Sequence, residues 1–361
     1  MECYAMNYSI HPQFQFSINP PNHLITVFHC EIITRLLQRC QTPNRLHQFT
    51  RTCRRLTSTG SEIMPLSDLE FPELFEFIDT HFHLDVLIRR LKTICKELNC
   101  DEVEGMLGPF HQHYLLFGIA NYVYPSSWQC WREQVNGNSR IRLTFGIHPH
   151  MTVSGVSSRM WRDLHQLIQE PICVAVGETG LDCTSDCECV KQGRTCHSIV
   201  QCKERNKANQ EEAFLNHLQL AARFDKPVVL HCRDHVDGTA AARVLQRIHQ
   251  HYFTNLKFHR HCFSRTLKEL ENWRLLPRVV FGITFGLRAD YNILENLIPK
   301  IPDNQLLLET DSPYLPPEND MRINHPWTVM YTAKFVAKLR NIPLSFLMTI
   351  VNQNTINFYR L

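Results

Sequence analysis

Residues Phe77–Asp85 read FIDTHFHLD, an apolar run that ends in two histidines spaced two apart. Successive side chains of an extended strand point to opposite faces, so His81 and His83 are predicted to point to the same face. FEFIDT, which leads into these histidines, is the first of eight short runs rich in β-branched or aromatic residues. The other seven are YLLFGIAN, IRLTFGI, ICVAVGE, PVVLH, NLKFHRH, RVVFGIT and QLLLET.

Longer amphipathic segments separate these runs. In LDVLIRRLKTICKELN, apolar residues recur at helical spacing, and QEEAFLNHLQLAARF has the same character. Eight alternations of a buried strand with a helix predict the α/β class and a (β/α)₈ TIM barrel. A doubly wound open sheet is the alternative, although it rarely needs so many strands in sequence. Two closing helices are expected, at His325–Leu339 and Leu344–Tyr359.

Composition divides the chain and limits its class. Residues 1–76 carry Pro-rich, Asn-rich and basic patches and predict a weakly structured N-terminal extension, whereas residues 77–361 carry the barrel pattern. The net charge of +3 is too small to argue for nucleic-acid binding by itself, and no run is long and apolar enough for a membrane span. The odd number of cysteines, 15, is scattered rather than framing a small domain, which predicts reduced thiols in a nuclear or cytoplasmic protein.

The chain holds five His-x-His pairs, and the barrel prediction sorts them. Chemistry in such barrels gathers at the carboxyl ends of the strands. The pairs His111/His113 and His249/His251 fail this test and are predicted to be solvated or helix-capping histidines. The residues that pass are His81, His83, His148, His150, His231, His259 and His261.

Two carboxylates also follow predicted strands, Glu178 in VAVGETGLD and Asp311 in LLLETDSPY. Imidazoles and carboxylates that meet at one end of a barrel predict a hydrolytic metal centre, in which one carboxylate bridges two ions and another orients or deprotonates water. Spacing alone leaves the choice between His259 and His261 open. It also leaves His148 and His150, on either side of Pro149, as ligand neighbours or substrate contacts.

The motifs DTHFHLD, FGIHPH, VGETGLD, KPVVLHCRD, HRHCFS and ETDSPYLPP, in this order, resemble the TatD family of metal-dependent deoxyribonucleases, which have amidohydrolase-like barrels. The resemblance runs from Phe77 to the C-terminus and is greatest to the animal, type 2-like members that carry HRHCF. It implies that the metal ligands are His81, His83, Glu178, His231, His261 and Asp311. It therefore selects His261 over His259 and leaves His148 and His150 outside the ligand set.

The resemblance implies a metal-dependent nuclease that cleaves phosphodiester bonds of DNA, or of RNA, as a 3′ to 5′ exonuclease. It is consistent with two divalent ions, either Mg, Mn or Zn, that share Glu178 as a ligand. Asp311 is expected to act as general base beside Glu178 in the catalytic set. Arg233 is expected to neutralise phosphate charge, or else to pair with Asp234 or Glu178. Further substrate contacts are predicted at Arg265, His148 and His150, and Trp128, Trp131 and Tyr314 are the aromatic candidates.

Two departures from the family pattern stand out. Arg265 replaces the glycine that usually follows HCFS, which adds a second candidate phosphate contact. A cysteine-containing insertion at 183–205 follows GLD, and it predicts either a structural zinc site or a flexible lid. Its thiols are Cys183, Cys187, Cys189, Cys196 and Cys202, with His197 beside the fourth. Its basic residues, Lys191, Arg194, Lys203, Arg205 and Lys207, would either follow a nucleic-acid backbone or be solvated.

Two other functions fit the same sequence. Related barrels hydrolyse amides and lactones with the same kind of activated water, so the substrate depends on the loops at the strand ends. A non-catalytic protein that binds nucleic acid or a protein partner through its extension and cysteine insertion is the third alternative. The intact ligand set argues against it, because the loss of one ligand would be expected in a vestigial site.

Overall fold

The structure is a computed structural model, and it describes residues 71–361 except 72, 95–112, 185–188, 190–194, 197, 235–238, 287–289, 319–320 and 322. Nearly all of the predicted N-terminal extension lies outside the described residues. So do His111, Cys187, Lys191, Arg194 and His197.

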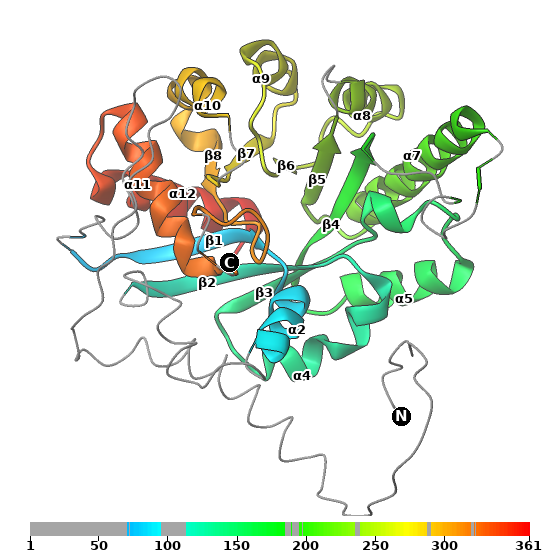
Figure 1. Cartoon of the computed structure of the whole chain (residues 1–361), viewed down its shortest axis with the longest axis horizontal. Coiled ribbons are helices and arrows are strands. Elements are labelled where there is room, and N and C mark those ends of the chain that lie inside the picture. The colour runs from blue at the N-terminus through cyan, green and yellow to red at the C-terminus, as the bar shows by residue number, and fades with distance from the viewer. Residues whose placement is uncertain are drawn as a thin grey trace, which may run out of the picture.

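Eight parallel strands in the described part of the chain form one sheet, in which each strand pairs with the next in sequence (Figure 1). The strands are β1 (Glu76–Phe82), β2 (Tyr114–Tyr122), β3 (Ile141–Phe145), β4 (Cys173–Asp182), β5 (Val228–Arg233), β6 (Phe258–Arg260), β7 (Val279–Ile283) and β8 (Leu306–Leu308). Each coincides with one of the predicted apolar runs. The predicted fold class, a (β/α)₈ barrel, is therefore confirmed.

The sheet closes where β1 meets the chain that follows β8. Phe82 forms a parallel bridge with Ser312. The backbone N–H of His83 donates to the Ser312 carbonyl at 2.7 Å, and the Thr80 hydroxyl donates to the Leu308 carbonyl at 2.9 Å. The alternative of a doubly wound open sheet is wrong, because its two edge strands would not meet.

Helices between and after the strands surround the barrel (Figure 1). They are α2 (Leu84–Ile94), α4 (Trp131–Val135), α5 (Ser158–Ile168), α7 (Ile199–Arg223), α8 (Thr239–Gln250), α9 (Leu267–Trp273), α10 (Tyr291–Leu297), α11 (Val329–Arg340) and α12 (Leu344–Tyr359). Short 3₁₀ helices are η3 (Pro125–Cys130), η4 (Pro149–Met151), η5 (Ile298–Lys300), η6 (Asp303–Gln305) and η7 (Pro326–Thr328). None of the described helices is both long enough and apolar enough to cross a membrane.

Two helix starts differ from the prediction. The helix expected from His325 begins at Val329, because a residue before proline disfavours the helical conformation and His325 is extended, with φ −147° and ψ 161°. The insertion predicted at 183–205 becomes helical at Ile199, since the Ser198 hydroxyl accepts the backbone N–H of Gln201 at 3.4 Å and caps α7. The last part of the insertion is thus the start of α7 and not a loop.

Apolar side chains fill the end of the barrel at which the strands begin. Ile119, Val229 and Leu307 form a buried cluster with Phe358 and Tyr359 from the end of α12. Each of the three strand residues lies two positions before a polar residue that faces the barrel axis, so strand alternation turns them to the axis as well. The amino-terminal end of the barrel is therefore filled by apolar groups, and its polar groups gather at the carboxyl end.

Candidate metal centre

His81, in β1, and His83, directly after it, both face the site, as the alternation predicts. Both are buried, and their ring centroids lie 5.1 Å apart. His83 Nδ1 lies 3.1 Å from the Asn121 carbonyl, to which it can only donate. In its neutral form, His83 therefore carries its proton on Nδ1 and turns an unprotonated Nε2 toward the site, which is the form of histidine that binds a metal ion.

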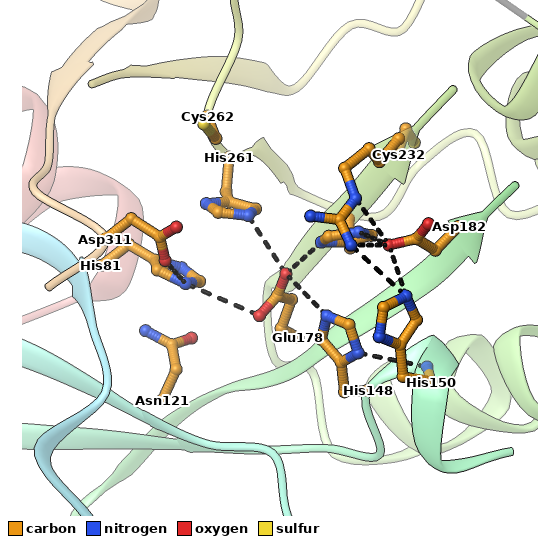
Figure 2. Close-up of polar contacts among 12 residues, drawn as sticks. His81, Asn121, His148, His150, Glu178, Asp182, Cys232, His261, Cys262 and Asp311 are labelled. Atoms are coloured by element: carbon orange, nitrogen blue, oxygen red, sulfur yellow. Dashed lines mark hydrogen bonds and ion pairs between the residues drawn. The ribbon is translucent and has the colours of Figure 1, made fainter. Parts of the chain in front are cut away.

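Glu178, on β4, lies between His81 on one side and His148 on the other (Figure 2). Its Oε2 is 3.6 Å from His81 Nε2 and 3.8 Å from His83 Nε2. Its Oε1 is 2.5 Å from His231 Nδ1 and 3.1 Å from His261 Nε2. Each carboxylate oxygen therefore faces a different pair of histidines.

Asp311 completes the first of these groups from the segment after β8. Its Oδ1 is 3.5 Å from His81 Nε2 and 3.3 Å from His83 Nε2. The backbone at Asp311 is left-handed, with φ 55°, a conformation that aspartate tolerates better than most residues, and its N–H donates to the His81 carbonyl at 2.9 Å. Its side chain is 16% exposed, so this carboxylate lies at the open side of the site.

The described residues fit one or more divalent metal ions. His81 is fully buried, yet neither of its ring nitrogens has a hydrogen-bond partner. A buried polar atom without a partner costs about 1–3 kcal/mol, and a metal ion would remove that cost. The predicted ligands form three overlapping groups whose donor atoms lie within 4.8 Å of one another: His81/His83/Glu178, Glu178/His231/His261 and His81/His261/Asp311. A fourth group, His148/Asp182/His231, shares His231 with them. The structure thus brings together all six predicted ligands, whose coordinating role stays a prediction.

The charges in this cluster are strongly coupled. Burial would raise the pKa of Glu178, but His261, His231 and His148 together hold it well below its usual value. Burial would lower the pKa of His261, but the carboxylates of Glu178 and Glu309 raise it well above its usual value. Burial, with His261 stacked at 3.9 Å, lowers the pKa of His81 well below its usual value. Glu178 is thus held as a carboxylate, the form that a cation requires, whereas a cation that binds beside His261 must displace the proton that the two carboxylates favour on that ring.

Comparison with known proteins identifies the family of this chain. The model of the family described as TatD related DNase matches residues 78–360. The chain belongs to the TatD-related DNase family. This confirms the resemblance that the ordered motifs indicated.

Curated relatives of the TatD family match most of the chain. The chain is 29% identical to the human 3′-5′ RNA nuclease TATDN2 over 84% of its own length, but it spans only 37% of the length of that protein. It is 32% identical to the 3′-5′ ssDNA/RNA exonuclease TatD of Edwardsiella piscicida, over 60% of this chain and 77% of that one. The crystal structure of YjjV, a TatD homologue from Escherichia coli, superposes with a TM-score of 0.61 at 22% identity and covers 79% of this chain and 98% of that one.

Asp182 is a site residue of this TatD-family barrel that the sequence prediction missed. Its Oδ2 lies 2.9 Å from His231 Nε2 and 2.9 Å from His150 Nε2, and it accepts a hydrogen bond from Arg233 Nε at 2.8 Å. The predicted strand ended at Glu178, whereas β4 continues to Asp182. Glu178 and Asp182 are four residues apart in one strand, and this even spacing was the signal in the sequence.

The predicted substrate contacts divide into two kinds. His148 and His150 lie at the site: His148 Nε2 is 3.9 Å from Glu178 Oε1, and its Nδ1 accepts the His150 N–H at 3.1 Å. Arg233 also lies there, but its ion pair is with Asp182 at 2.7 Å, so the predicted alternative of Asp234 or Glu178 as its partner is wrong. Asp234 instead accepts the backbone N–H of Ala240 and caps α8.

Of the other predicted contacts, only Tyr314 lies at the site in the described structure. Arg265 is half-buried in the loop between β6 and α9, and no hydrogen bond or ion pair joins it to the described site residues. Trp128 and Trp131 are buried in the apolar core, where Trp128 Nε1 donates to the Tyr122 carbonyl at 3.0 Å. Tyr314 does reach the site, with its ring 5.5 Å from that of His83.

Glu309, a fully buried residue, separates the roles of the last histidine pair. Both His259 and His261 face the barrel axis, but His259 Nδ1 bonds the Tyr359 hydroxyl at 2.6 Å and its Nε2 lies 3.1 Å from Glu309 Oε2. Glu309 Oε1 lies 3.3 Å from His261 Nδ1 and also accepts the Thr284 hydroxyl at 2.9 Å. Such a contact orients His261 Nε2 toward Glu178. The sequence prediction missed Glu309 because it took Asp311 as the acidic residue that follows the eighth strand.

Two histidine pairs were predicted to be solvated or helix-capping. His249 and His251 are exposed at the end of α8, as predicted. The prediction is wrong for His113, which is fully buried and packs edge-on against Phe71, with ring centroids 4.5 Å apart. Its Nδ1 accepts the backbone N–H of Phe75 at 3.2 Å. It lies at the start of β2, the end of the barrel opposite the site.

Proposed function

We propose that the chain is a metal-dependent nuclease that hydrolyses phosphodiester bonds of DNA or RNA from the 3′ end. One observation carries the proposal: Glu178 faces one pair of imidazoles with each carboxylate oxygen, which is the arrangement of a carboxylate shared by two ions. The relatives named as a 3′-5′ RNA nuclease and a 3′-5′ ssDNA/RNA exonuclease support the same activity.

Two divalent ions would be held by six residues from five strand ends. His81, His83, Glu178 and Asp311 would hold one ion, and Glu178, His231 and His261 the other. Such ions polarise a phosphate oxygen and lower the pKa of water, which is the chemistry that phosphodiester hydrolysis needs. The four imidazoles favour manganese or zinc over magnesium, because magnesium prefers oxygen ligands.

Asp311 and Arg233 are the two groups that act directly on the reactants. The Asp311 carboxylate lies within 3.5 Å of two ligand nitrogens and is partly exposed, so it can take the proton of the attacking water. The Arg233 side chain is 50% exposed beside Asp182 and can reach a phosphate oxygen from the other side of the site. Asp182 would hold Arg233 in place together with His150.

Tyrosines at the site favour a nucleic acid over the alternative of an amide or a lactone. Tyr124 and Tyr314 are both partly exposed, and their hydroxyls lie 3.4 Å apart next to His83. The guanidinium of Arg90 lies 4.7 Å above the Tyr314 ring. Proteins that bind single-stranded nucleic acids use exposed aromatic rings to stack on the bases and nearby cations to contact the phosphates. Neither the tyrosine rings nor the Arg90 guanidinium is needed to bind a small uncharged lactone.

The proposed compartment is the nucleus or cytoplasm. Every cysteine in the described part of the chain is a free thiol. Reducing compartments maintain that state, whereas secreted proteins of many cysteines usually form disulfides.

Asp311→Asn tests the proposal. Wild-type protein, treated with chelator and then given manganese, magnesium or zinc, should shorten 5′-labelled single-stranded DNA or RNA stepwise from the 3′ end. Asp311→Asn should lower the rate by about a hundredfold or more, because the amide cannot accept the proton of water. Asp163→Asn, on α5 and 47% exposed, is the matched control and should cleave at the wild-type rate. Equal rates for wild type and Asp311→Asn, or no cleavage of either polymer with any ion, would reject the nuclease.

A further inference from the structure

Three cysteines converge in the connection between β4 and α7, outside the site described above. The Sγ atoms of Cys189, Cys196 and Cys202 all lie within 4.8 Å of one another, and those of Cys189 and Cys202 are 3.7 Å apart. Cys189 and Cys196 are half-buried, and Cys202 lies in the first turn of α7. The three thiols therefore come together from three separate points of the insertion.

Neither core packing nor a disulfide accounts for this cluster. Cys202 belongs to neither apolar cluster of the protein, and its neighbours Ile199 and Val200 are exposed. A disulfide joins two sulfurs at about 2.05 Å and would leave the third thiol unexplained. A tetrahedral ion with zinc–sulfur bonds of about 2.3 Å would instead place its sulfurs about 3.8 Å apart. The Cys189–Cys202 separation of 3.7 Å fits that geometry.

The electrostatic surroundings favour thiolates, the form that binds metal. Arg205 Nη2 donates to Cys202 Sγ at 3.4 Å. Cys202 also lies near the amino-terminal end of a long helix, where the helix dipole stabilises negative charge. Lys203 and Lys207 are exposed in the same turns of α7 and would offset the negative charge of a metal bound by several thiolates.

We infer that Cys189, Cys196 and Cys202 bind a structural zinc ion that is separate from the catalytic ions. Three thiolates select a soft, tetrahedral ion and disfavour magnesium. The described residues supply three of the four donors that such an ion needs.

The position of the cluster gives the ion a role in the fold. The insertion begins directly after Asp182, whose N–H donates to Gln210 Oε1 at 2.9 Å and whose carbonyl accepts from Gln210 Nε2 at 3.2 Å. Gln210 lies two turns after Cys202 on α7. An ion at the three thiols would join Cys189 and Cys196, which precede α7, to the same helix that holds Asp182.

Cobalt substitution and zinc analysis test the inference without reference to nuclease activity. The full chain, purified with reductant and loaded with cobalt, should show thiolate-to-cobalt charge-transfer absorption, which the imidazole and carboxylate ligands of the catalytic site cannot produce. Cys202→Ser and Cys189→Ser should each lose this absorption and about one equivalent of tightly bound zinc. Cys130→Ser, a half-buried cysteine in η3, is the matched control and should keep both.

Two results would overturn the inference. One is wild-type protein without the charge-transfer absorption. The other is a Cys189–Cys202 disulfide, found by mass spectrometry after alkylation without reduction in the freshly purified protein. Two separate serine variants are used so that poor folding of one does not decide the result.

Discussion

The Arg233 side chain is bound to Asp182 on one side and is exposed to solvent on the other. Its Nε and Nη2 both contact Asp182 Oδ2, and half of its side chain remains exposed. Its Nη2 also lies 3.3 Å from His150 Nε2. A guanidinium fixed on one side and free on the other is well suited to bind a phosphate that enters the barrel.

Arg233→Ala should weaken binding of single-stranded DNA by roughly tenfold and reduce the salt dependence of log Kd by about one phosphate contact. Binding is best measured by fluorescence anisotropy at several salt concentrations in the Asp311→Asn background, where substrate is consumed far more slowly than by wild type. Arg274→Ala, at an exposed position after α9, serves as control and should leave the slope unchanged. An unchanged slope for Arg233→Ala would mean that Arg233 only positions Asp182.

Single residues also show what sequence can and cannot predict. That the six predicted ligands meet at one end of the barrel was predictable because strand alternation and strand ends place them, and the family resemblance decided between His259 and His261. Their role as ligands stays a prediction. Asp182 and Glu309 were not predictable, since their roles depend on where β4 and β8 end. A strand boundary shifted by four residues turned Asp182 from a loop residue into a site residue.

At the scale of elements, α7 connects several parts of the site. Gln210 holds the end of β4, and His217 holds the loop that carries His148. His217 is fully buried: its Nε2 accepts the backbone N–H of Ile147 at 3.0 Å, and its Nδ1 bonds the Ala213 carbonyl at 2.6 Å. Both bonds require the neutral imidazole, and burial lowers the pKa of His217 from 6.5 to about 4.

This pKa shift predicts acid sensitivity of the fold. Below pH 6.5 the unfolded chain binds a proton at His217 while the folded chain does not, so stability falls as the pH drops toward 4. The loss between pH 7 and pH 5 should be about 2 kcal/mol for this residue. His217→Gln keeps an acceptor for the Ile147 N–H. Between pH 7 and pH 5 its free energy of unfolding, measured in urea, should fall by about 2 kcal/mol less than that of wild type. His249→Gln, exposed on α8, should behave like wild type; equal pH sensitivity of His217→Gln and wild type would contradict the prediction.

Elements were predicted better in their order than in their ends. All eight strands follow from short apolar runs, because a strand buried on both faces has no other signature. The starts of α7 and α11 depend on a serine cap and on a proline that keeps His325 extended. Those local contacts decide the residue at which each helix begins. Helical periodicity by itself predicts only the region in which a helix can form.

At the scale of the whole molecule, closure of the barrel assembles the site but also buries polar groups, which lowers the stability of the fold. It brings His81 from the first strand against Asp311 from beyond the last, and it buries imidazoles around Glu178. Neither ring nitrogen of His81 has a hydrogen-bond partner within the described structure. The metal-free fold therefore carries unpaired polar groups in its interior, and ions that bind them should stabilise the whole barrel.

Metal binding should therefore be visible as global stability. Adding manganese at about 100 times its Kd to chelator-treated protein should stabilise the fold by about 2.7 kcal/mol for one site, and raise Tm by several degrees. The Cys202→Ser background removes any contribution of the thiol cluster. In that background Glu178→Gln should lose most of the shift, because each group of histidines loses its shared carboxylate, whereas Glu212→Gln, exposed on α7, should retain it. An equal manganese-induced shift in the Glu178→Gln variant would show that the ions bind elsewhere, and the assignment of this carboxylate as their common ligand would then be wrong.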